Sequence, residues 1–132
     1  MTLLPVWEQI RISVPPQNRY PLEDLGTLCW VPMCGERGER GYHHIVRRSF
    51  TGRPVDHIAI DGLVLDNRAK LCTWHHDDVT ENRALIAYLT GEHWLWCTPV
   101  PAALAVGFQT TINPRTGTVY VVHGKLERKD VG

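Results

Sequence analysis

Hydrophobic and polar positions alternate most regularly in two parts of the chain, and both predict β-hairpins. Residues 57–60 and 63–65 form short apolar runs on either side of an Asp61-Gly62 step. Glycine tolerates the positive φ that a tight turn requires. Residues 108–112 and 118–122 are rich in β-branched side chains and flank the turn sequence Asn-Pro-Arg-Thr-Gly. The pattern therefore predicts antiparallel strands in both places.

A helix is predicted to begin at Trp74 or His75 and to end at Gly91, because apolar or long side chains recur at intervals of three or four residues. The pattern that predicts this helix consists of Val79, Arg83, Ile86 and Leu89 or Tyr88.

Weaker patterns complete the expectation. Residues 7–14 and 42–46 are expected to be strands, and 21–28 could form one helical turn. Residues 93–96 form an apolar run that Pro99 and Pro101 should break, and 102–108 reads as a buried strand or short helix. Residues 125–132 are expected to be a frayed polar tail.

Composition is ordinary for a soluble globular protein of one domain, with 132 residues, 43% hydrophobic residues and zero formal net charge. Any basic surface must therefore be local. No apolar run approaches the roughly 20 residues of a membrane span, and the first residues lack the apolar stretch of a signal peptide. We expect a cytoplasmic protein with no membrane partner.

The four cysteines change this picture, because three of them lie near histidines. Cys29 and Cys34 form a Cys-x4-Cys pair, and Cys72 and His75 form a Cys-x2-His pair about forty residues later. In a reducing compartment such spacing favours tetrahedral zinc over disulfides, although buried free cysteines remain the plainer alternative. Cys97 is most simply a small buried hydrophobic residue.

Two pairs of adjacent histidines, His43-His44 and His75-His76, accompany these cysteines. Successive strand residues point to opposite faces, and successive helical residues point about 100° apart. If His75 binds zinc, His76 must face elsewhere, so the two histidines of each pair can have different roles.

The segments Tyr42-His-His-Ile45 and Asp66-Asn67-Arg-Ala-Lys-Leu-Cys72-Thr-Trp-His-His76 resemble the HNH endonuclease family. The resemblance covers roughly residues 29–89, with His75 in place of the family's usual fourth cysteine. It implies an α+β fold with a ββα-metal core and a structural zinc knuckle, to which this chain adds a C-terminal β-hairpin. The implied single nuclease domain spans 1–132, with an N-terminal arm (1–28), the zinc-bound core (29–91), C-terminal strands (92–124) and a tail (125–132).

The resemblance also implies the roles of individual residues in a metal-dependent endonuclease or nickase that hydrolyses DNA. His44 would be the general base that activates water, and Asn67 would orient the strand of His44 or contact the metal. His43 and His76 would hold a catalytic Mg²⁺, Mn²⁺ or Ni²⁺ ion, separate from the zinc. An imidazole near its ordinary pKa suits proton abstraction at neutral pH.

Five basic residues near this site would contact DNA phosphates, with largely sequence-independent and salt-sensitive affinity. They are Arg47, Arg48, Arg53, Arg68 and Lys70. Trp74, Trp94 and Trp96 are assigned to the core. A homodimer, or a phage packaging protein or other partner, would fit the small size of the chain.

Three alternatives stay open at the level of sequence. Asp56-His57 is a rival for the family's first-strand site, although it lies closer to Asn67 than the usual loop allows. The chain could be a catalytically inactive, zinc-stabilised module that binds nucleic acid or another partner. It could also be a metalloenzyme with another substrate, but it lacks the glutamate that His-x-Glu and His-Glu-x-x-His hydrolases place beside a ligand histidine.

Overall fold

The computed structural model describes residues 3–5, 12–13, 25–45, 56–60, 63–89, 93–113 and 116–129. Within these ranges one α-helix accompanies antiparallel β-sheets, so the fold is mixed, as the sequence predicts. The elements are β1 (Leu3–Pro5), β2 (Ile12–Ser13), β3 (His43–His44), β4 (His57–Ile60), β5 (Leu63–Asp66), β6 (Arg68–Ala69), α2 (Thr73–Thr80), β7 (Leu85–Leu89), β8 (His93–Val100), the 3-10 helix η1 (Ala102–Leu104), β9 (Thr110–Ile112) and β10 (Val119–Lys125).

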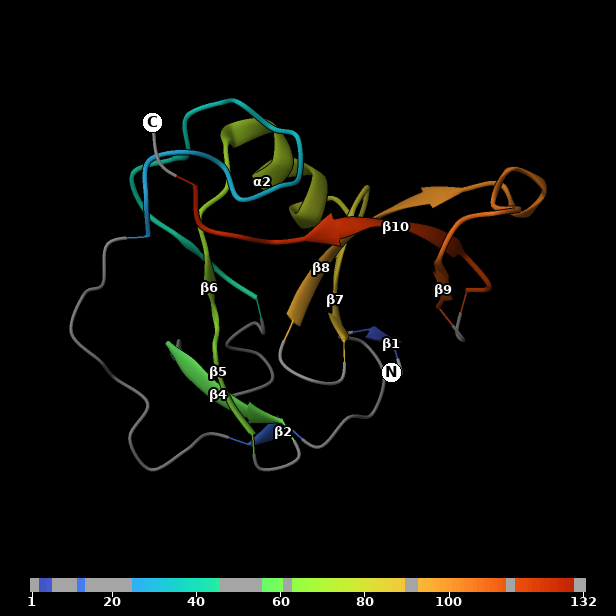
Figure 1. The fold of residues 1–132 in the computed structure, drawn as a ribbon, viewed down its shortest axis with the longest axis horizontal. Coiled ribbons are helices and arrows are strands. Elements are labelled where there is room, and N and C mark those ends of the chain that lie inside the picture. The colour runs from blue at the N-terminus through green and yellow to red at the C-terminus, as the bar shows by residue number, and fades with distance from the viewer. Residues whose placement is uncertain are drawn as a thin grey trace.

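The described strands form three sheets, with the orders β1-β7-β8-β10-β9, β2-β4-β5 and β3-β6. The small β2-β4-β5 sheet lies at one end of the molecule, and α2 lies at the other (Figure 1). The chain from β5 through β6 runs between these two ends and leads directly into α2 (Figure 1). This path brings the residues before α2 next to β3.

Both predicted hairpins are confirmed. β4 pairs with β5 in a register that sets Ile58 opposite Leu65, and β9 pairs with β10. Strand β3 confirms part of the strand expected at 42–46, and β2 falls within the strand expected at 7–14. Residues 25–28 are not helical, and the rest of the helical turn expected at 21–28 lies outside the described residues.

The long helix expected from Trp74 to Gly91 is wrong. Helix α2 ends at Thr80, and Asn82 takes a left-handed conformation with φ 62° that turns the chain into β7. Ile86 and Tyr88 then pair with β8 as alternate residues of a strand. A short apolar segment can fit both the helical and the strand periodicity. Here pairing and burial against the neighbouring strand β8 select the strand.

The break expected at Pro99 is also wrong, since β8 continues through it to Val100. Strand β7 reaches only as far as the pair Leu85 and Cys97, whereas β10 continues beside β8 as far as Val100. Among the described strands, Pro99 therefore has a neighbouring strand, β10, on one side only. A proline, which has no backbone N–H, is tolerated at such an edge position.

Residues 102–108 include the short helix η1, but they are not buried. Leu104, Val106 and Phe108 are 68%, 83% and 62% exposed. The tail expected to fray is docked instead as far as Lys129: Leu126 is buried, and its backbone N–H donates to the carbonyl oxygen of Trp94 at 2.8 Å.

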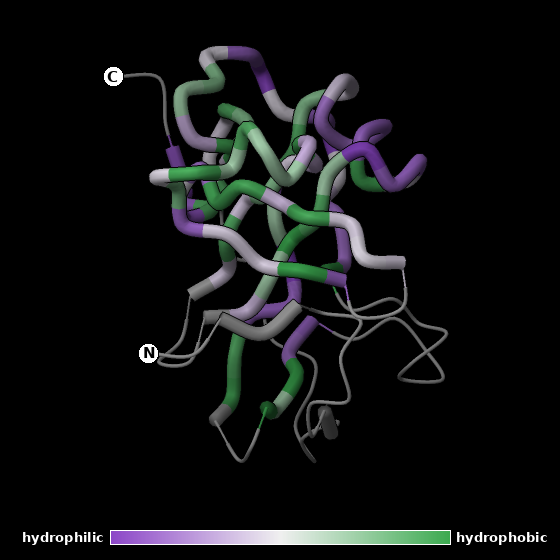
Figure 2. Tube along the Cα trace, turned by 90° about the vertical axis from the view of Figure 1, so that its right-hand side faces the viewer, coloured by the Kyte–Doolittle hydropathy of each residue, from purple (hydrophilic) through white to green (hydrophobic). Residues whose placement is uncertain are grey.

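The large sheet separates two hydrophobic clusters, because alternate residues of β7 and β8 point to opposite faces. Ile86, Tyr88, Trp94 and Trp96 pack into the larger cluster, which also contains β4, β5 and β6 side chains. Ala87, Leu95, Cys97 and Tyr120 form the smaller cluster on the other face. Figure 2 shows hydrophobic residues throughout the chain trace, with hydrophilic stretches mainly in the upper half of that view.

Trp94 and Trp96 belong to the core as predicted, but Trp74 does not. It is 75% exposed on α2. No helix among the described residues has the length and apolar character to cross a bilayer.

The β4-β5 hairpin should depend on its buried face. Ile58 is fully buried, whereas Val64 on the adjacent strand is 46% exposed. We expect Ile58→Ala to lower the free energy of unfolding by about 2–5 kcal/mol, because it leaves a cavity in the core. Val64→Ala should change it by no more than about 0.5 kcal/mol. Urea denaturation of both variants measures the difference, and equal losses would contradict this packing.

Candidate metal centre

The first two cysteines lie in a tight loop that we call the cysteine knuckle (residues 28–37). An antiparallel bridge between Leu28 and Arg37 closes its base. At its tip the N–H of Cys34 donates to the carbonyl of Val31 at 3.1 Å, and the exposed Met33 adopts a positive φ of 66°. This turn brings both ends of the Cys-x4-Cys segment back to one side.

Backbone hydrogen bonds hold the cysteine knuckle against the residues that precede α2. The N–H of Trp30 donates to the carbonyl of Lys70 at 2.8 Å, and the N–H of Glu39 donates to the carbonyl of Leu71 at 2.9 Å. Cys72 follows directly as the N-cap residue of α2, and His75 lies in the first turn of the helix. The two ligand pairs, distant in sequence, therefore meet.

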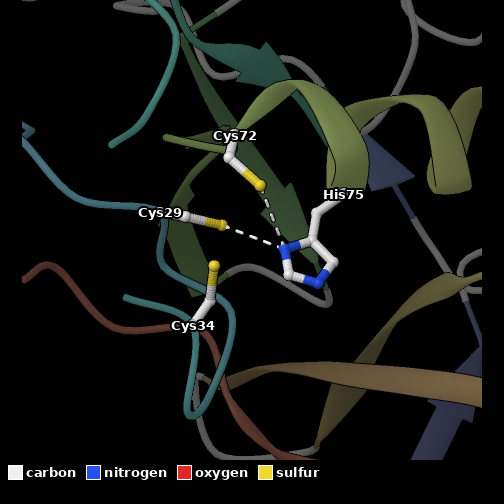
Figure 3. A group of neighbouring side chains, drawn as sticks. All are labelled: Cys29, Cys34, Cys72 and His75. Atoms are coloured by element: carbon white, nitrogen blue, oxygen red, sulfur yellow. Dashed lines mark hydrogen bonds between the residues drawn. The ribbon is translucent and has the colours of Figure 1, made fainter. Parts of the chain in front are cut away.

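The side chains of Cys29, Cys34, Cys72 and His75 converge on one point (Figure 3). Their ligand atoms all lie within 4.8 Å of one another. The Nδ1 atom of His75 lies 3.4 Å from the Sγ atom of Cys29 and 3.3 Å from that of Cys72.

This geometry fits a tetrahedral zinc ion. Zn–S bonds of about 2.3 Å and a Zn–N bond of about 2.0–2.1 Å place neighbouring ligand atoms roughly 3.6–3.8 Å apart. Three thiols and an imidazole also form a donor set that selects zinc over Mg²⁺ or Ca²⁺, because these two ions prefer oxygen ligands. The predicted set of four residues is confirmed as a group that could hold zinc.

Burial opposes ionisation of the ligands in the absence of a metal. It raises the pKa of the Cys29 thiol to about 12. It also lowers the pKa of His75, which favours the neutral imidazole that a metal ligand requires. Binding of a metal would displace the Cys29 proton, so metal affinity should fall with acidification. Cys97 is separate and fully buried, with a pKa also raised to about 12, which confirms its expected role as a hydrophobic residue.

The docked C-terminal segment also contacts the cysteine knuckle. The Nζ atom of Lys129 donates to the carbonyls of Val31 and Cys34 at 2.6 and 2.8 Å, and the carbonyl of Lys129 accepts from the N–H groups of Thr27 and Leu28. These contacts close the loop from the outside. These contacts could not be predicted from the sequence, because a polar tail has no hydrophobic periodicity.

Helix α2 directs His75 and His76 to different neighbours, as predicted. The ring of His75 lies 5.1 Å from that of Trp96, and its Nδ1 atom faces the thiols of Cys29 and Cys72. The ring of His76 lies 5.3 Å from that of His43, and its Nδ1 atom lies 2.7 Å from Glu39 Oε1. His43 and His76 line a cavity of about 240 Å³ that also includes Glu39, Gly41, Tyr42 and Leu71.

His44, the next residue of β3, has different partners. Its Nε2 atom lies 3.1 Å from Asp56 Oδ1, which also accepts a hydrogen bond from the Tyr42 hydroxyl at 3.2 Å. Asp56 thus belongs to the same network as His44, and the rival site expected at Asp56-His57 is not separate from it. His57 itself lies at the start of β4, opposite Asp66.

Asn67 is fully buried between these elements. Its N–H donates to the carbonyl of Asp56 at 2.8 Å, and its carbonyl accepts from the N–H of Ile45 at 2.9 Å. The peptide groups of Asn67 therefore join the end of β3 to the residue that faces His44.

The basic residues divide into three cases. Arg68 is only 1% exposed and forms two 2.9 Å hydrogen bonds to the Asp66 carboxylate, so its expected contact with DNA is wrong. The bond to Asp66 also raises the pKa of Arg68. Lys70 is partly exposed. The expected contacts of Arg47, Arg48 and Arg53 lie outside the described residues.

Sequence reasoning missed Glu39 and the partnership of Asp56 with His44. Glu39 belongs to the segment Gly35–Gly41 (GERGERG), whose glycines and alternating charges are typical of a solvated turn. Only the folding of this segment against α2 reveals its contact with His76.

Comparisons with known protein families, with curated protein sequences and with solved structures found no match to this chain.

The metal centre leads to a direct test on Cys29. The protein purified in zinc-containing medium should carry one equivalent of zinc, and Cys29→Ser should lose it. Because metal binding and folding are coupled, loss of zinc should lower Tm by at least about 10 °C and reduce the helical circular dichroism signal. Zinc analysis and thermal denaturation measure both effects.

Cys97→Ala is the matched control, since Cys97 is equally buried but lies outside the cluster. It should keep its zinc and cost at most about 2 kcal/mol. Zinc retention by Cys29→Ser would contradict the ligand assignment.

Proposed function

We propose that this protein is a metal-dependent endonuclease of the HNH type that hydrolyses DNA phosphodiester bonds. The observation that carries the proposal is the meeting of His43 and His76 at one cavity, directly beside the Cys3His cluster. A scaffold that needs only zinc has no use for a second pair of histidines at this position.

The order of the elements supports the proposal. Strand β3 pairs with β6, with His44 opposite Arg68, and α2 begins four residues after β6. Two antiparallel strands followed by a helix, with histidines on the first strand and on the helix, are what the resemblance to HNH nucleases implies.

His43 and His76 are the residues that would hold the catalytic ion. Two imidazoles bound to one ion at about 2.1 Å have ring centres roughly 5 Å apart, close to the 5.3 Å between these rings. Imidazole ligands suit Ni²⁺, Co²⁺ or Zn²⁺ better than Mg²⁺. The bound ion would stabilise the negative charge that develops on the phosphate in the transition state.

His44 would act as the general base, with Asp56 as the residue that orients it. A carboxylate only accepts hydrogen bonds, so its contact with Nε2 requires a proton on that nitrogen of His44. In the neutral imidazole, Nδ1 is then the nitrogen free to take a proton from water. Tyr42 shares the carboxylate and restricts the rotation of Asp56. Histidine held by a carboxylate in this way is a common arrangement for proton abstraction.

DNA would be bound through its phosphates. Lys70 lies next to the metal centre, and Arg47, Arg48 and Arg53 occupy the chain between β3 and β4. Contacts of this kind give affinity that falls steeply with salt and depends little on sequence.

A supercoiled-plasmid assay with Mn²⁺, Ni²⁺ or Mg²⁺ tests this function. The wild type should nick or linearise the plasmid only with added metal, and His44→Ala should lower the rate by about 10²–10⁴-fold, the usual contribution of a general base. His123→Ala is the control, because His123 is an exposed histidine of β10 that lies outside the proposed site.

Equal cleavage by wild type and His44→Ala would exclude His44 as the base. Absence of cleavage with every metal, in folded and zinc-loaded protein, would favour the zinc-stabilised binding module instead. Retarded migration of DNA with that protein would then identify its ligand.

A further inference from the structure

Glu39 lines the cavity of His43 and His76 but is not one of the residues proposed to bind either metal. Its Oε1 atom lies 2.7 Å from Nδ1 of His76, and its other oxygen accepts a hydrogen bond from the Thr73 hydroxyl at 3.5 Å. Both partners belong to α2, and Glu39 also lines the cavity that contains His43.

The contact determines which nitrogen of His76 can bind a metal. Since the carboxylate accepts a hydrogen bond, Nδ1 must carry the proton, and in the neutral ring the lone pair is then on Nε2. Histidine ligands commonly donate their other N–H to a carboxylate, which fixes the tautomer and orients the ring toward the metal.

Stability alone gives little reason for this pair. The side chains of His76 and Glu39 are 40% and 41% exposed, and exposed ion pairs contribute little to folding. The backbone of Glu39 is nevertheless well fixed, through the 2.9 Å hydrogen bond to Leu71 beside the zinc ligand Cys72.

We propose that Glu39 is a positioning residue for the catalytic ion, and that it orients His76 through the Nδ1 proton. The inference rests on the proposed function, because it assigns His76 to that ion.

The test uses zinc-loaded full-length protein and measures Mn²⁺ binding by electron paramagnetic resonance, together with plasmid cleavage. Glu39→Ala should weaken Mn²⁺ binding by about 10–100-fold with zinc content unchanged. Glu39→Gln keeps an acceptor oxygen and should restore most of the affinity. Glu36→Gln is the matched control, because it removes a charge from an exposed position of the same loop.

Long-range ¹H–¹⁵N NMR of His76 without Mn²⁺ gives a second readout that a purely structural role would not move. The wild type and Glu39→Gln should show the Nδ1–H tautomer, and Glu39→Ala should lose it. If Glu39→Ala keeps the Mn²⁺ affinity and the His76 tautomer of the wild type, the inference about Glu39 is overturned. The proposed function would still stand in that case, provided that the wild type cleaves DNA. Equal losses of affinity in the Ala and Gln variants would also overturn it, since Glu39 would then be a direct ligand. If the wild type neither binds Mn²⁺ nor cleaves DNA, both proposals fall together.

Discussion

The convergence of three thiols and one imidazole is the constraint on which the rest of the site depends. Helix α2 has eight residues, no side-chain cap and no fully buried residue. A helix this short is marginal in water, and its packing against the core is limited mainly to the partly buried Val79 and to the contact of His75 with Trp96. With a metal bound, Cys72 and His75 would fix its first turn, and Cys29 and Cys34 would tie that turn to the cysteine knuckle. A bound zinc ion would therefore determine where α2 lies and, with it, where His76 points.

The adjacent histidines turn this local constraint into a candidate catalytic arrangement. On α2, His75 faces the thiols while His76 faces Glu39 and His43. On β3, His43 faces α2 while His44 faces Asp56. His44 and His76, which are proposed to act on water and to hold the ion, each contact a carboxylate that selects the tautomer of the ring. Two His-His dipeptides thus supply four imidazoles that face different neighbours.

Sequence was sufficient where the signal is local. The two hairpins follow from alternation and turn residues, and the four residues of the Cys3His cluster follow from two short spacings. Prediction from sequence failed where tertiary contacts determine the local structure or the exposure of a side chain. Ile86 and Tyr88 fit a helix as well as a strand until β8 pairs with them, and Pro99 is tolerated because β7 ends before it. Arg68 is a candidate DNA contact in the sequence, but in the fold its side chain is buried and its guanidinium is hydrogen-bonded to Asp66. Glu39 and Lys129 have no signature at all, since their roles arise only when their segments fold against α2 and the cysteine knuckle.

X-ray absorption at the zinc edge of the purified protein tests the central claim most directly. The claim predicts a first shell of three sulfur atoms at about 2.3 Å and one nitrogen atom at about 2.0–2.1 Å. A shell of nitrogen and oxygen ligands only, or protein that folds with no bound metal, would contradict the metal centre and the placement of α2 that depends on it.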